Sequence, residues 1–112
     1  MLFRSLERQL LELAQAAPGA ELRRHVAAIL EPIYEARGQW AQWIGVIEVQ
    51  LAYEDDRWRR LESLIRIGKT YEEKLQTPAA AFNAYARAFA EDYGNPDLQV
   101  ELDRLEIGRA HV

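Results

Sequence analysis

Two histidines, His25 and His111, are the side chains of this sequence that could gain or lose a proton near neutral pH. His25 has no second histidine at the spacing of a metal site. Glu21 precedes it by four residues, so the two could form an exposed pair on one helix face. We therefore interpret His25 as a surface residue, with a place on a binding face as the alternative.

An acidic cluster, Glu54-Asp55-Asp56, stands in a predicted turn. A metal-binding loop would need spaced oxygen ligands and a glycine for the bend, and this cluster has neither. The favourable interaction of carboxylates with the N-terminus of the next helix explains Asp55 and Asp56 instead.

Other patterns that support catalysis or cofactor binding are missing from the sequence. It has no Ser-His-Asp set, no glycine-rich phosphate loop and no cysteine, and its six glycines are isolated at turns or helix crossings. The sequence therefore predicts a protein that is not an enzyme and that binds no metal or cofactor.

Length and composition limit the class of protein that can hold these residues. The 112 residues fit one domain, and 49% hydrophobic with 29% charged residues is typical of a folded globular chain. The longest apolar run is far shorter than the roughly 20 residues of a membrane span. A net charge of −4 disfavours a nucleic-acid partner, including RNA bound by a helical repeat. The compartment stays open, with the cytoplasm favoured.

Turn residues divide the chain into helical segments with apolar residues at helical spacing, and no stretch alternates as a strand would. We therefore predict an all-α protein. The six segments span residues 6–16, 20–37, 40–54, 57–75, 77–92 and 96–105.

Two prolines and three tryptophans need comment. Pro32 lies inside the second segment, which we predict as one helix because its apolar stripe continues in phase; a break into two helices is the alternative. Thr77 is predicted to cap the fifth segment before Pro78. The tryptophans are predicted to be core or partly buried, with Trp40 or Trp58 as an exposed binding anchor in the alternative.

The segments repeat in pairs. Tyr34-Glu35 and Tyr71-Glu72 stand 37 residues apart, and each follows a basic pair. Residues 6–10 also match residues 47–51, so the first segment resembles the third. Helix pairs at this period are typical of an α-solenoid, because one hairpin cannot bury both of its apolar faces. We predict a half repeat at 6–16, repeats at 20–54 and 57–92, and a half repeat at 96–105.

The fourth and fifth segments resemble a tetratricopeptide repeat. The residues that carry the resemblance, at nearly the spacing of that family, are Leu64, Ile67, Gly68, Tyr71, Ala81, Tyr85 and Ala88. The small residues would allow close helix crossings, and the aromatic residues Tyr71, Phe82, Tyr85 and Phe89 would fill the gaps between helices.

The resemblance implies that the first helix of each pair lines a concave groove that binds a peptide or a helix. The groove candidates are His25, Glu35, Glu62, Ile65, Arg66, Lys69 and Glu72. A solvated charged face is the competing interpretation, because Glu62 and Arg66 have the spacing of an ion pair within one helix.

Both ends of the chain resemble translated sequencing adapters. Residues 106–112 match one adapter in frame, and residues 1–5 match the complementary adapter if GTG serves as a bacterial start codon. We therefore expect residues 6–105 to be a metagenomic fragment from inside a longer bacterial helical-repeat protein.

These patterns favour a non-catalytic protein–protein interaction scaffold. A spacer or regulatory arm of a larger enzyme or signalling protein is the alternative. The terminal helices would lack stacking partners, so self-association through them is also predicted. Their outer faces are expected to expose Leu6, Leu10, Leu98 and Leu102.

Overall fold

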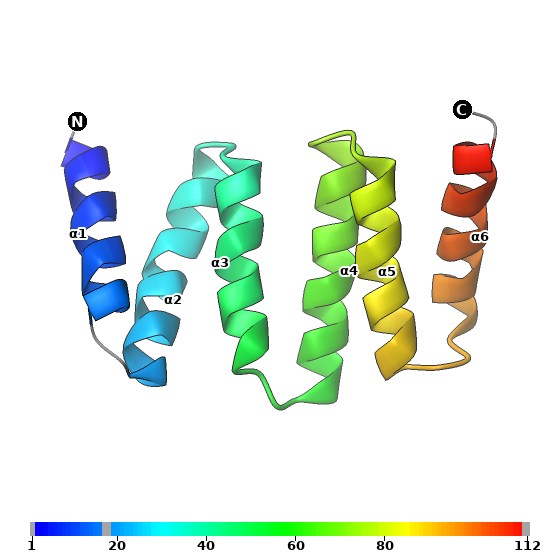
Figure 1. The fold of residues 1–112 in the computed structure, drawn as a ribbon, viewed down its shortest axis with the longest axis horizontal. Coiled ribbons are helices and arrows are strands. Elements are labelled where there is room, and N and C mark those ends of the chain that lie inside the picture. The colour runs from blue at the N-terminus through cyan, green and yellow to red at the C-terminus, as the bar shows by residue number, and fades with distance from the viewer. Residues whose placement is uncertain (1, 17–18, 111–112) are drawn as a thin grey trace. The chain divides into compact units, whose positions relative to one another are not determined.

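The computed structural model describes residues 2–16 and 19–110, and it contains six α-helices and no strand within them (Figure 1). This confirms the all-α prediction. The helices are α1 (Leu2–Ala16), α2 (Ala20–Ala36), α3 (Trp40–Ala52), α4 (Arg57–Glu73), α5 (Pro78–Glu91) and α6 (Pro96–Ala110). They form two compact units, Met1–Tyr53 and Glu54–Val112.

Unit 1 contains α1, α2 and α3, which run antiparallel to their chain neighbours (Figure 1). The turn between α2 and α3 uses Gly38 at a φ of 67°, a left-handed conformation that glycine adopts without strain. The Gln39 amide donates to the Tyr34 carbonyl at 3.0 Å, which closes the end of α2. The buried side chains of the pair are Val26, Ala27, Leu30, Tyr34, Trp43, Ile44, Val46, Ile47 and Leu51.

Pro32 does not interrupt α2, which confirms the prediction of a single helix over the alternative of two. The residue lies on the exposed side, while Leu30 and Tyr34 on either side of it are buried. The buried stripe of α2 therefore continues past Pro32, although this residue has no amide donor.

Unit 2 contains α4, α5 and α6, again antiparallel in chain order (Figure 1). Gly68 of α4 lies against the ring of Tyr85 on α5, and this close approach joins the two helices. Of the small residues that we expected at helix crossings, Ala81 and Ala88 are completely buried. Among the expected gap-filling aromatic residues, Tyr85 is buried and the other three are half-buried.

The caps of unit 2 agree with the sequence in part. Asp56 accepts a hydrogen bond from the Arg59 amide at 3.0 Å, so the acidic turn begins α4 as predicted. Pro78 begins α5, but the Thr77 hydroxyl donates to the Leu75 carbonyl at 3.0 Å and does not cap the helix. Asn95 accepts hydrogen bonds from the amides of Asp97 and Leu98 and begins α6.

The terminal helices are longer than the apolar pattern predicts. α1 begins at Leu2, and α6 continues to Ala110. Apolar spacing reports only the part of a helix that packs against a neighbour, so it missed these extensions. The expected exposure of Leu6 is confirmed, whereas Leu98 is 3% exposed and that expectation was wrong. Leu10 and Leu102 are half-buried.

Candidate functional site

The seven groove candidates lie on two helices, one in each unit. In unit 1, His25 and Glu35 are exposed on α2. In unit 2, α4 exposes Glu62 and Lys69 and leaves three candidates half-buried, namely Ile65, Arg66 and Glu72.

Unit 2 has a hollow of about 360 Å³ beside α4, α5 and α6, which we call the α4–α6 hollow. Two of the seven candidates, Ile65 and Lys69, line it. The structure brings them together with the first turns of α6, a wall that sequence reasoning missed. The other lining residues are Tyr85, Asn95, Asp97, Leu98, Val100 and Glu101.

The chemistry of the α4–α6 hollow suits recognition. Lys69 is the one cation among its lining residues, which also include the carboxylates of Asp97 and Glu101, and Val100 in the same lining leaves 61% of its surface exposed. The Asn95 side chain is already used, because its amide nitrogen donates to Asp92 at 2.8 Å and its oxygen caps α6. An apolar group and an anion could therefore bind side by side.

Tyr85 cannot act as a base in this hollow near neutral pH. Burial, together with the nearby carboxylates of Glu101 and Glu72, raises the pKa of Tyr85 to about 12. Its phenol therefore stays protonated under ordinary conditions, and its buried ring serves packing against Gly68.

Glu72 is held inside unit 2 by Arg104 of α6. The Arg104 guanidinium donates to both Glu72 oxygens, at 2.8 Å for the Oε1 contact, and also reaches Glu101. These hydrogen bonds hold the pKa of Glu72 below its ordinary value, although partial burial opposes them. Glu72 therefore joins α4 to α6, and its carboxylate is not free for a ligand.

Replacing Arg104 with methionine is expected to lower the free energy of unfolding of unit 2 by about 1 kcal/mol at pH 7, because the bidentate pair is only partly exposed. The pKa of Glu72 is lower in the folded state, so its ionised form stabilises the protein at pH values above the unfolded-state pKa. This contribution disappears as the pH falls through the folded-state pKa of Glu72. Urea unfolding at decreasing pH should therefore show the free energies of unfolding of Arg104→Met and of the wild type converging.

Arg8→Met is the matched control for this change. Arg8 pairs with Glu12 on α1 at 3.6 Å, and both side chains are about two-thirds or more exposed. We expect this variant to change stability little. A pH-independent difference between Arg104→Met and the wild type would contradict the role given to Glu72.

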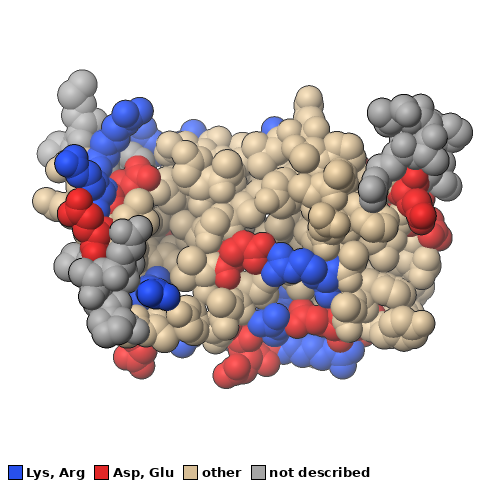
Figure 2. All heavy atoms as spheres, in the orientation of Figure 1, with Lys and Arg blue, Asp and Glu red and all other residues tan. Residues whose placement is uncertain are grey.

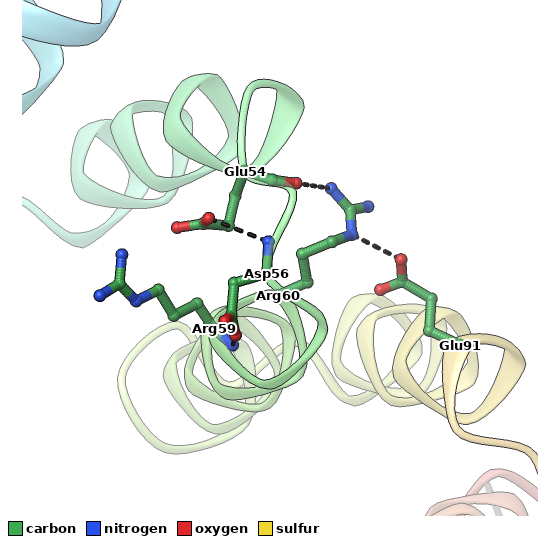
Figure 3. Close-up of polar contacts among 5 residues, drawn as sticks. All are labelled: Glu54, Asp56, Arg59, Arg60 and Glu91. Atoms are coloured by element: carbon green, nitrogen blue, oxygen red, sulfur yellow. Dashed lines mark hydrogen bonds and ion pairs between the residues drawn. The ribbon is translucent and has the colours of Figure 1, made fainter.

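The basic pair that precedes Tyr71 has a structural role. Arg60 donates to the Glu91 carboxylate at 2.6 Å and to the Glu54 carbonyl at 3.0 Å, so it ties the start of α4 to the end of α5 (Figure 3). Glu54 in turn accepts from the Asp56 amide at 3.1 Å. The acidic cluster therefore organises a helix start, as its position in the sequence predicts.

The three tryptophans differ in environment. Trp43 is buried and meets half-buried Trp40 edge to face, with ring centroids 6.0 Å apart, which agrees with predicted packing. Trp58 is 71% exposed, so the prediction of core or partial burial was wrong for this residue. Its position in the first turn of α4 keeps the anchor alternative open.

In unit 1, a polar contact joins α1 to α2. The Tyr34 hydroxyl donates to the Glu7 carboxylate at 2.6 Å. Burial, this hydrogen bond and the Glu7 charge all raise the pKa of Tyr34 above its usual range.

Comparisons with protein-family models, curated proteins and solved structures find no match to this chain. Within the described part of the chain, no helix is long and apolar enough to cross a bilayer, as predicted. The described residues also contain no group of three or more His, Cys, Asp or Glu side chains that are placed so that they could hold a metal ion. On the face drawn in Figure 2, basic and acidic side chains lie next to one another, without a continuous basic stripe among the residues described there.

Proposed function

We propose that this protein is a non-catalytic protein-interaction scaffold, built from helix pairs that stack as a solenoid similar to tetratricopeptide repeats. The equivalence of its two central pairs supports this architecture. Leu30 and Ile67 each stand four residues before the repeated tyrosine, and both are almost fully buried. Each pair also ends its first helix at a tight turn with one positive φ, at Gly38 or at Gln76.

The proposed binding site is the α4–α6 hollow, and the observation that carries this assignment is that Lys69 and exposed Val100 line the same hollow. An extended peptide could place an apolar side chain against Val100 and Ile65 and an acidic side chain against Lys69. The exposed ammonium group and the apolar patch together favour peptides that combine both residue types.

Selection from a random peptide library against the full chain tests this proposal. We expect enriched peptides to pair an apolar residue with Asp or Glu. Lys69→Glu should weaken the binding of these peptides by about tenfold, which corresponds to about 1.4 kcal/mol. Calorimetric titration of each variant with one enriched peptide measures the effect.

Arg59→Glu provides the charge-matched control, because Arg59 is exposed on the same helix and does not line the α4–α6 hollow. This variant should bind the peptide as the wild type does. Equal weakening of peptide binding in both variants would mean that the effect comes from the overall charge of the protein and not from the position of Lys69. Enrichment of peptides without acidic residues would remove the role assigned to Lys69.

A further inference from the structure

Unit 1 contains a hollow of about 460 Å³ between α1, α2 and α3, which is more apolar than the α4–α6 hollow of unit 2. We call it the α1–α3 hollow. Its volume lies in the range of pockets that hold small ligands. Its apolar wall comes from all three helices and consists of Leu11, Val26, Ala27, Leu30, Val46 and Val49.

Gly45 of α3 also lines the α1–α3 hollow, and its presence there has no conformational explanation. It lies inside a helix, where glycine is less favourable than alanine, and it is not one of the glycines with positive φ. A Cβ atom at Gly45 would meet nothing within 4 Å, whereas one at Gly68 would meet the Tyr85 ring at 2.8 Å. Gly68 therefore allows close packing, whereas Gly45 is exposed and leaves the space beside it open.

The polar residues that line the α1–α3 hollow are Glu7, Arg23, Tyr34 and Gln42. Glu7 is occupied by the Tyr34 hydroxyl at 2.6 Å. Arg23 is exposed and forms no ion pair with another described residue. At a rise of about 1.5 Å per residue, Tyr34 and Arg23 stand about 16 Å apart along α2. An anion at Arg23 would therefore lie far from the Glu7 carboxylate.

These features favour a hydrocarbon chain over a peptide. An extended peptide backbone needs a hydrogen-bond partner for each buried amide and carbonyl, and this largely apolar wall offers few partners. A hydrocarbon chain needs none, and its burial is favourable. A carboxylate at its end would pair with the Arg23 guanidinium.

We propose that the α1–α3 hollow binds an aliphatic carboxylate, with its chain along the apolar wall past Gly45 and its carboxylate against Arg23. The site lies in unit 1 and does not depend on the peptide site proposed for unit 2.

Sodium decanoate, titrated calorimetrically into the full chain below its micelle concentration, tests this site. We expect saturable one-to-one binding. Gly45→Leu should abolish it by filling the space, while Ala41→Leu, which places the same side chain at another exposed position of α3 outside the hollow, should not. Circular dichroism of both variants checks that helix content is retained.

Arg23→Glu and Arg24→Glu form the second matched pair. Both residues are exposed on α2, but only Arg23 lines the α1–α3 hollow. Arg23→Glu should weaken decanoate binding by about tenfold or more, while Arg24→Glu leaves it unchanged.

Three results would overturn the proposal. The first is the absence of saturable binding to the wild type, and the second is unchanged binding to Gly45→Leu. The third is a dimer in sedimentation that Gly45→Leu dissociates and decanoate does not affect, because the occupant would then be a second copy of the chain.

Discussion

Replacing Gly68 with valine is expected to lower the free energy of unfolding of unit 2 by about 2–3 kcal/mol, the upper part of the range for overpacked cores. A Cβ atom at this position would lie 2.8 Å from Cε1 and 2.9 Å from Cζ of Tyr85. Tyr85 is 2% exposed, so moving its ring away from the new methyl groups would break its buried packing contacts. Either α4 and α5 must separate or the ring must leave its packed position. Urea denaturation followed by circular dichroism measures the loss.

Gly45→Val is the control, because it makes the same change inside a helix with nothing within 4 Å of the new Cβ atom. Removing a glycine favours the helix, but valine has a lower helix propensity than alanine, and these two effects nearly cancel. Stability should therefore change by less than about 0.5 kcal/mol. Comparable losses in the two variants would mean that helix propensity, and not the contact with Tyr85, makes Gly68 necessary.

A double-mutant cycle separates the contact from other effects. Tyr85→Leu alone should destabilise unit 2 because it removes buried aromatic surface. In the Gly68→Val background the same change makes room for the new methyl groups, so the two losses should not add. Strict additivity would contradict direct overpacking.

The helix pairs of this protein could be predicted from its sequence because two independent signals agree there. In unit 2, apolar spacing predicts the buried face of α4, and Pro78 marks the first residue of α5. In unit 1, the stripe on both sides of Pro32 predicts one helix, although proline alone predicts a break. Apolar spacing that stays in phase on both sides of a proline therefore predicts one continuous, packed helix.

The candidate site was only half predictable, because spacing along one helix does not reveal what packs beside it. Ile65 and Lys69 were expected on one face of α4, and both line the α4–α6 hollow. Val100 was not foreseen, because Leu98 was expected to be exposed on the outer face and is buried instead. Trp58 shows the converse case. Its spacing from Leu61 suits the buried stripe, yet in the first turn of α4 it remains exposed.

Truncating Ile67 to alanine is expected to have the largest effect of the changes considered, a loss of about 2–5 kcal/mol in the free energy of unfolding. Its side chain is 0% exposed, so the substitution leaves a cavity among α4 and its packing partners. Ile65→Ala is the control, because Ile65 is only half-buried on the same helix and lines the open α4–α6 hollow. Its loss should be clearly smaller.

The same variant distinguishes the proposed solenoid from two independent units. In a stacked repeat array, the stability of one pair depends on interactions with its neighbour. Amide hydrogen exchange of Ile67→Ala should therefore show faster exchange in α2 and α3 as well as in α4 and α5. The equivalent substitution in unit 1, Leu30→Ala, should do the reverse and speed exchange in α4 and α5. If each substitution affects only its own pair, the pairs do not stack, and the proposed solenoid is wrong.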